Sequence, residues 1–239
     1  MDGNGKKADI DDTTGEVFDA AVASMASCFL NQGIAFLNGG DEIFRQKVMK
    51  PDDPMFDKLV ESYKQGSYRH DDGHVDTWWE GDGYAMASGN WLVRNSYQYG
   101  DAVNSFKWDR KAKYFDHYQK VVEVSALRNQ LMSNLFGRSK ADIKAGKCNV
   151  FGSTYDSGSS PLVACYLGGR NNDSYYLLFG GRMDDTYTSL SCANCSIEVL
   201  YSSPISTLRP EAHYAGQTFE ITNQLLGAAK YELMLVKVS

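Results

Sequence analysis

Imidazole and carboxylate side chains gather in one short stretch, residues 70–76, which reads His-Asp-Asp-Gly-His-Val-Asp. Such carboxylates could hold calcium, whereas the two histidines would favour zinc. The spacing matches neither a calcium-binding loop nor a zinc-binding helix, so a solvated acidic loop is the expected structure. We therefore predict no metal ion here.

Cys192 and Cys195 form a single C-x-x-C pair between two expected β-strands. A structural zinc ion would need a second pair of ligands, and a redox pair would stand where a helix begins after a strand. The chain has five cysteines, an odd number, which disfavours a disulfide framework. We predict a reduced pair or a turn without chemistry, and no cofactor, since no glycine-rich phosphate loop is found.

Trp78 and Trp79 lie in a polar loop, rich in glycine and aspartate, that covers residues 67–91. A loop of this length inside a compact domain is more often functional than accidental. The face of an indole ring covers the apolar face of a pyranose, so the pair could stack on a glucan. The same rings could instead anchor the long loop, and the sequence leaves both interpretations open.

Composition limits the class of protein. Of the 239 residues, 43% are apolar and 23% are charged, which is typical of globular proteins, and the net charge is −6. No cluster of lysine and arginine offers the basic surface that nucleic acids require, and no run approaches about eighteen apolar residues. We predict neither nucleic-acid binding nor a membrane span. Residues 1–14 lack the pattern of a secretory signal, which predicts a cytoplasmic protein if it is made as given.

Helical and strand patterns alternate at the start of the chain. A capping box at residues 13–16, followed by apolar residues at steps of three and four, predicts a helix that ends near Leu30. Residues 34–37 read Ile-Ala-Phe-Leu. This short apolar run predicts a strand that is buried on both faces, as in parallel sheets.

Two further helices precede a change of pattern. Asp53 as N-cap and Pro54 as the first helical residue predict one helix, and residues 110–138 predict a longer helix that is apolar on more than one face. After Gly146, short runs rich in β-branched and aromatic residues are separated by turn residues. Five or more antiparallel strands are expected there, which predicts a β-sandwich and a domain boundary near residues 138–150.

Two segments carry a family resemblance. Residues 31–47 read N-Q-G-I-A-F-L-N-G-G-D-E-I-F-R-Q-K, and residues 95–110 read N-S-Y-Q-Y-G-D-A-V-N-S-F-K-W-D-R. The first is similar to the eighth strand and following turn of pullulanase-type enzymes, roughly S-Q-G-I-P-F-L-x-x-G-x-E-x-x-R-x-K. The second resembles the segment that follows in those enzymes, N-S-Y-x-x-x-D-x-(V/I)-N-x-x-x-W. In this order, the two segments resemble the α-amylase superfamily of glycoside hydrolases.

The resemblance implies an α/β part followed by an all-β part. Residues 1–140 would be the C-terminal part of a (β/α)8 catalytic barrel, strand eight and its flanking helices, with an inserted loop at about residues 48–93. Residues 146–239 would be a C-terminal antiparallel β-sandwich. Because a barrel needs roughly 200 residues or more, the chain would hold only a fragment of one.

The resemblance also implies a substrate class, the α-1,6-branched α-glucans: starch, glycogen and pullulan. Glycoside hydrolysis needs a carboxylic acid and a second carboxylate. In the family these groups and a third aspartate lie on barrel strands four, five and seven, which would precede residue 14. We therefore expect a chain without catalytic residues, inactive alone. One alternative is a non-catalytic glucan-binding or assembly module. Another is a chain that associates with a partner that supplies barrel strands one to seven, or with a second copy of itself.

The candidate binding residues follow from the second segment. In the superfamily an acidic residue there binds glucose hydroxyls, and the resemblance places Asp101 at that position, with Asn95, Tyr97 and Asn104 shaping the same loop. Carboxylates and amides suit sugar hydroxyls because they form paired hydrogen bonds. Each of these residues could instead only pin the loop. Glu42 and Arg45 are expected to hold the barrel mouth structurally rather than to take part in catalysis. The expected ligand is an α-glucan oligosaccharide.

Overall fold

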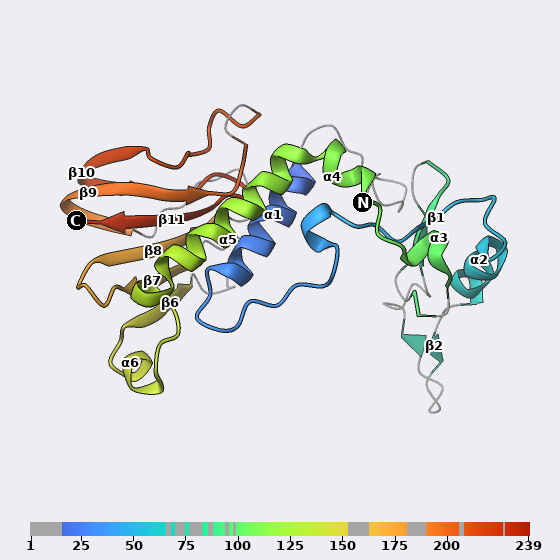
Figure 1. The fold of residues 1–239 in the computed structure, drawn as a ribbon, viewed down its shortest axis with the longest axis horizontal. Coiled ribbons are helices and arrows are strands. Elements are labelled where there is room, and N and C mark those ends of the chain that lie inside the picture. The colour runs from blue at the N-terminus through green and yellow to red at the C-terminus, as the bar shows by residue number, and fades with distance from the viewer. Residues whose placement is uncertain are drawn as a thin grey trace. The chain divides into compact units, whose positions relative to one another are not determined.

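The structure, a computed structural model, describes residues 16–65, 68–69, 75–76, 83–85, 88–93, 96–97, 99–152, 163–180, 190–205, 208–226 and 228–239. The chain divides into two compact units. Unit 1 consists of Met1–Thr14 and Ile43–Lys111, and unit 2 of Gly15–Glu42 and Ala112–Ser239. Figure 1 labels the helices and strands of both.

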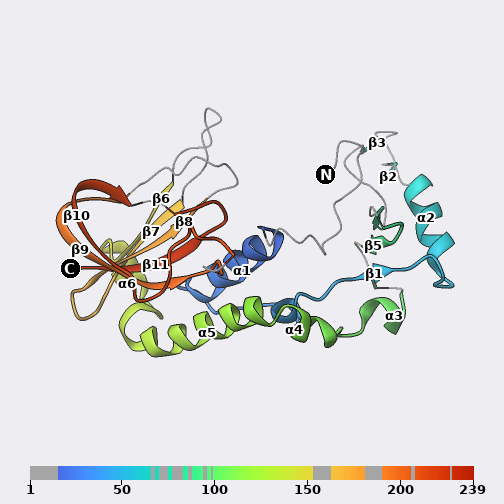
Figure 2. The same ribbon diagram turned by 90° about the horizontal axis from the view of Figure 1, so that it is seen from above.

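Two helices form one layer of unit 2. Helix α1 (Glu16–Phe29) confirms the helix predicted to end near Leu30. The helix predicted over residues 110–138 is divided into α4 (Asp109–Lys113) and α5 (Phe115–Leu135), because Tyr114 departs from helical geometry with φ −116° and ψ 41°. Figure 2 shows α1 and α5 lying side by side, and the two helices pack against each other. Among the described residues, no helix combines the length and apolar character needed to cross a membrane.

Six antiparallel strands form the sheet of unit 2, in the order β10-β9-β11-β8-β7-β6. A short helix, α6 (Lys140–Lys144), precedes them and begins with a capping box made by Ser139 and Asp142. The strands are β6 (Cys148–Gly152), β7 (Val163–Gly168), β8 (Ser174–Phe179), β9 (Leu190–Ser202), β10 (Thr218–Leu226) and β11 (Leu233–Val238). The antiparallel strands predicted after Gly146 are confirmed.

Strand β11 is buried on both faces of this sheet. Leu233 and Leu235 join the core that α1 and α5 share with the sheet, whereas Met234 and Val236 join a second core built from β8, β9 and β10. This alternation follows from the two-residue period of a strand. The described strands of unit 2 form one sheet, and helices rather than a second sheet cover one of its faces. The predicted β-sandwich is therefore not confirmed.

Residues 34–37 do not form the predicted buried strand. No described strand pairs with them, and the side chains of Ile34 and Phe36 are 95% and 83% exposed. An extended segment becomes a strand only when a neighbour accepts its backbone hydrogen bonds. The neighbours that a parallel barrel would supply are not among the described strands, which all pair antiparallel, so the barrel fragment is not confirmed either.

Unit 1 consists of short elements around a small core. A three-residue 3-10 helix, η1 (Asp41–Ile43), leads into the unit. The elements that follow are β1 (Val48–Met49), α2 (Phe56–Gln65), β2 (Tyr68–Arg69), β3 (Val75–Asp76), β4 (Gly83–Ala85), β5 (Trp91–Val93) and α3 (Asp101–Asn104). Strands β1, β5 and β4 form one antiparallel sheet, and β2 pairs with β3. Met49, Leu59, Val93, Tyr99 and Val103 are buried together.

Helix α2 begins at Phe56, two residues later than the predicted first helical residue Pro54, so Asp53 is not its N-cap residue. Asp53 lies in the turn before the helix, where its Oδ1 atom accepts a hydrogen bond from the Met55 backbone N–H at 2.9 Å. Helix α2 and strands β1, β4 and β5 thus give residues 48–93 regular structure and a share of the core of unit 1.

Candidate functional site

Helix α3 presents the candidate binding residue Asp101 in its first turn. The side chain of Asp101 is exposed, and that of Tyr97, four residues earlier, is 95% exposed. The neighbouring Ser96 and Tyr99 are buried at 8% and 6% exposure. The local fold therefore turns the carboxylate and the phenol toward solvent while their neighbours anchor the loop.

The amide of Asn104 fixes this loop. Its Nδ2 atom donates to the backbone oxygens of Ser96 at 2.8 Å and Tyr99 at 2.5 Å. Both donor positions of the amide are thus used within the protein. Asn104 has the contacts of a loop-pinning residue, and Asp101 is the candidate that keeps its oxygens toward solvent.

Arg45 extends the site with an aromatic face. Its Nη1 atom donates to the backbone oxygen of Asn104 at 3.4 Å, and its guanidinium lies 5.4 Å from the ring centroid of Phe106. Phe106 in turn stacks on Trp108, with centroids 5.6 Å apart and planes inclined by 19°. Trp108 remains 64% exposed, so a flat indole face is open to a ligand. The second sequence segment contains both Phe106 and Trp108, but neither was predicted as a sugar contact.

These groups can bind a sugar but cannot cleave one. An exposed carboxylate and a phenol can form paired hydrogen bonds with hydroxyl groups, and an exposed indole can cover the apolar face of a pyranose. Cleavage of a glycosidic bond requires two carboxyl groups facing each other across it. Asp101 is the one carboxylate in this group of residues.

Three predicted sugar contacts, Asn95, Trp78 and Trp79, lie outside the described residues. The same holds for residues 70–74 of the acidic stretch, whereas Val75 and Asp76 form β3. Within the described ranges, no cluster of three or more histidine, cysteine, aspartate or glutamate residues could hold a metal ion.

Glu42 and Asp41 bind their own turn. A Glu42 carboxylate oxygen accepts from the Gly40 backbone N–H at 3.0 Å, and an Asp41 oxygen accepts from the Asn38 backbone N–H at 3.0 Å. Both carboxylates thus satisfy backbone donors of residues 38–43, which is the contact pattern of residues that shape a turn.

The cysteine pair was predicted wrongly in part, because Cys195 is disulfide-bonded. Cys195 lies on β9 and its side chain is buried. A second pair, Cys148 and Cys165 on neighbouring strands, has its sulfur atoms 4.0 Å apart and is reduced. Burial raises the pKa of the Cys165 thiol to about 12, and the neighbouring Cys148 adds to this effect, so Cys165 is a weak nucleophile.

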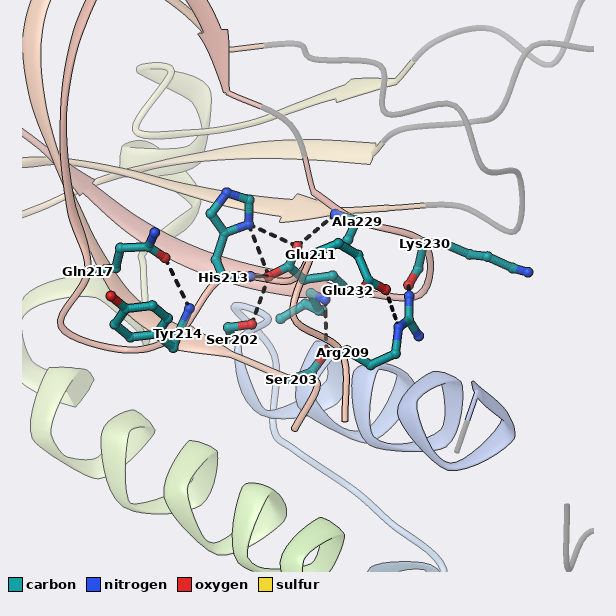
Figure 3. Close-up of polar contacts among 11 residues, drawn as sticks. Ser202, Ser203, Arg209, Glu211, His213, Tyr214, Gln217, Ala229, Lys230 and Glu232 are labelled. Atoms are coloured by element: carbon teal, nitrogen blue, oxygen red, sulfur yellow. Dashed lines mark hydrogen bonds and ion pairs between the residues drawn. The ribbon is translucent and has the colours of Figure 1, made fainter. Parts of the chain in front are cut away.

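A buried carboxylate, Glu232, organises the polar contacts of the sheet unit (Figure 3). Its oxygens accept hydrogen bonds from the Ser202 hydroxyl at 2.8 Å and from the backbone N–H groups of His213 at 2.8 Å and Ala229 at 2.7 Å. The His213 Nδ1 atom lies 3.1 Å from Oε2. Burial favours a raised pKa for Glu232, but His213 and the other donors outweigh it and lower the pKa.

This cluster contains the residue types of a serine hydrolase but not the geometry. A nucleophilic serine must donate to the histidine that activates it. Here the Ser202 hydroxyl donates to Glu232, and Ser202 is fully buried. The cluster therefore holds the connection between β9 and β10 against β11 and offers no site for nucleophilic catalysis.

No protein-family model matches the chain, and no curated protein matches it in sequence. Solved structures match its fold. The pullulanase from Bacillus acidopullulyticus aligns with a TM-score of 0.56 and 17% identity over 95% of this chain and 21% of its own. The pullulanase from Anoxybacillus sp. LM18-11, in complex with maltotriose, aligns with a TM-score of 0.54 and 14% identity over 95% of this chain and 24% of its own. The catalytic module of SpuA, a multi-modular glycogen-degrading pneumococcal virulence factor, aligns with a TM-score of 0.53 and 17% identity over 93% of this chain and 31% of its own.

The chain therefore spans less than a third of the length of each of these proteins. Nearly the whole chain aligns with a part of their fold, and the chain itself is a mixed α/β arrangement with antiparallel sheets. The predicted likeness to a pullulanase-type C-terminal portion is confirmed at the level of the fold.

Proposed function

We propose that this chain is the C-terminal portion of a pullulanase-like glycoside hydrolase that acts on α-1,6-branched α-glucans. One observation carries the proposal: 95% of the chain follows the fold of the Bacillus acidopullulyticus pullulanase while covering only 21% of it. The two sequence segments at residues 31–47 and 95–110 support the same assignment. The domain division near residues 140–146 belongs to this proposal, since it reflects descent from a barrel and a following β-domain.

In this proposal the catalytic acid and nucleophile lie on barrel strands that the chain does not include. The chain alone is then expected to release no reducing sugar from pullulan, because a single exposed carboxylate such as Asp101 cannot both protonate the leaving oxygen and attack. A reducing-end assay over a long incubation, with an intact pullulanase as positive control, measures this. Turnover that follows the protein through purification would contradict it.

The contribution of the chain would be sugar contacts from Asp101, Tyr97 and the Trp108 face, with Asn95, Trp78 and Trp79 as further predicted contacts. We expect Asp101→Asn to weaken maltotriose binding about tenfold, since a hydrogen bond to a charged group is worth about 1.5 kcal/mol or more. Titration calorimetry measures the affinity. Asp57→Asn, an exposed carboxylate on α2, is the matched control and should bind as the parent chain does. Equal affinities for all three proteins would remove Asp101 from the site.

The second candidate is a non-catalytic glucan-binding or assembly module, and the exposed stack of Phe106 and Trp108 favours it. The two candidates differ in what the chain does alone. A module binds glucan with a useful affinity by itself, and this binding falls on Trp108→Ala or on Trp78→Ala and Trp79→Ala. A portion of a longer enzyme binds glucan much more weakly until the rest of the barrel is present, so its affinity is measured at high maltotriose concentration.

We further propose that residues 34–37 are covered by another protein surface, either a second copy or a partner that supplies barrel strands. The support is the exposure of Ile34 and Phe36, at 95% and 83%, since unpaired apolar segments drive association. Size-exclusion chromatography with light scattering should show association that the double change Ile34→Ser and Phe36→Ser abolishes. The control is Leu208→Ser, which changes an isolated leucine with 60% exposure. A monomer at all concentrations would contradict self-association.

A further inference from the structure

Arg45 lies between the two parts of the candidate site. Its Nη1 atom donates to the backbone oxygen of Asn104 at 3.4 Å, and its guanidinium carbon lies 5.4 Å from the ring centroid of Phe106. Asn104 fixes the loop that presents Asp101. Phe106 stacks on the exposed indole of Trp108. One side chain therefore contacts both the part of the site that offers hydrogen bonds and the part that offers an apolar face.

The backbone just before Arg45 has an unusual conformation. Phe44 has a φ of 56°, in the left-handed region that a bulky residue rarely adopts. Its side chain is buried, and its backbone oxygen accepts a hydrogen bond from Arg110 Nε at 2.6 Å. Strain of this kind persists only where the surrounding structure determines it, and it is concentrated at active sites and ligand sites. The fold thus fixes the direction in which Arg45 leaves the chain.

The contacts of Arg45 contribute more to geometry than to stability. The side chain is half-buried, and among the described residues it makes one hydrogen bond, at 3.4 Å, and pairs with no carboxylate. A hydrogen bond of this length is weak. An arginine that served stability alone would gain more from a bidentate pair with a carboxylate. What Arg45 determines is the position of the Phe106 ring relative to the end of α3.

A fixed ring is what stacking on a sugar requires. Phe106 and Trp108 are 40% and 64% exposed, and their planes are inclined by 19°. Exposed side chains exchange between rotamers unless a neighbour holds them. A guanidinium is attracted to the π electrons of a ring, so Arg45 restricts Phe106, and Phe106 restricts the indole. A ring that is held before binding loses less conformational entropy when the ligand arrives, which raises the affinity.

We propose that Arg45 is a positioning residue of the glucan site, which holds the Trp108 indole and the Asp101 loop in an arrangement that one oligosaccharide contacts together. This inference rests on the proposed function, because that function supplies α-glucan as the ligand class. It makes the role of Arg45 more specific than the structural support that the sequence predicted.

NMR titration of the full chain with maltotriose, up to a high ligand concentration, tests this role. Arg45→Met keeps the length of the side chain and removes the guanidinium, so we expect an affinity about fivefold to tenfold lower. Arg45→Lys keeps the charge but not the planar group, so it should recover little of the loss. Lys58→Met, which removes an exposed cation from α2, is the matched control and should bind as the parent chain does.

A double-mutant cycle shows whether Arg45 acts through the aromatic pair. Phe106→Leu removes the ring that Arg45 contacts and should weaken binding by itself. The double variant of Arg45→Met and Phe106→Leu should lose less affinity than the two single losses combined, because both changes break the same chain of contacts. The indole N–H signal of Trp108, assigned with Trp108→Phe, should shift in Arg45→Met before any ligand is added. Melting temperatures should stay within about 3 °C of the parent chain.

The outcomes separate this inference from the proposed function. Lower affinity in Arg45→Met and Arg45→Lys, with a shifted Trp108 signal and unchanged melting, supports the positioning role. Unchanged affinity in Arg45→Met while Asp101→Asn weakens binding overturns the role and leaves the proposed function in place. Full affinity in Arg45→Lys, or a loss of affinity that only follows a loss of melting temperature, also overturns the role. No binding of maltotriose by the parent chain overturns both.

Discussion

Replacing Glu232 with alanine is expected to lower the free energy of unfolding by about 3–5 kcal/mol, the usual cost of breaking a buried charged pair. The change removes the acceptor of three hydrogen bonds, from Ser202, His213 and Ala229. The donors of Ser202 and Ala229 would stay buried without this acceptor, because both residues are buried. Urea unfolding followed by circular dichroism measures the loss. Glu220→Ala, an exposed glutamate on β10, should change stability by less than about 0.5 kcal/mol.

The same carboxylate predicts a dependence on pH. The pKa of Glu232 is lowered from its ordinary value of 4.5, so its stabilising effect is complete above that value and is lost as the pH falls through the folded-state pKa. We expect the difference in stability between the parent chain and Glu232→Gln to shrink as the pH falls from 7 to 3. Comparing the two proteins cancels the effects of Asp142, Asp173 and Glu211, whose pKa values are also lowered. A constant difference over this range would show that the fold does not lower the pKa of Glu232.

Replacing Arg128 with alanine is the second change with a large expected effect, a loss of about 2–4 kcal/mol from hydrogen bonds to a charged group. Its guanidinium donates to the backbone oxygens of Phe29, of Asn31 at 2.9 Å and of Gly33 at 2.7 Å, and it lies 4.8 Å from the Phe136 ring centroid. The first of these oxygens is at the end of α1, where carbonyl groups lack helical partners.

Two further variants sharpen this test. Arg128→Lys keeps the charge but not the planar fork of donors, so it should recover only part of the lost stability. Lys144→Ala removes an exposed cation from α6 and should have little effect. Limited proteolysis gives a second readout, because residues 31–37 should be cut faster once Arg128 no longer holds the chain after α1. Full recovery in Arg128→Lys would show that charge alone, and not the paired geometry, is responsible.

The sequence predicted the elements that depend on local patterns. Helix α1 and the antiparallel strands after Gly146 follow from the periodicity of apolar residues and from turn residues, which are local features of the sequence. Residues 34–37 were predicted wrongly because their burial depends on strands that are not part of the described chain. The same limit applies to the sandwich, since alternation along a strand does not tell whether a helix or a second sheet covers it.

The candidate site was predictable only through its motif. Asp101 and Tyr97 were identified by the family pattern, and the structure leaves both side chains exposed. The stack of Arg45, Phe106 and Trp108 joins residues about sixty positions apart, and Glu232 meets Ser202 and His213 from three separate segments. No spacing in the sequence reports such contacts, because chain topology creates them.

The position of β11 has a consequence for folding during synthesis. β11 pairs with both β9 and β8, yet it follows them in the chain, so the β6–β8 strands and the β9–β10 strands are joined in one sheet only through residues 233–238. While the ribosome still covers these residues, strands β8 and β9 would each have an unpaired edge at the position where β11 later pairs. The six-stranded sheet of the nascent chain can therefore be completed only after β11 has left the exit tunnel.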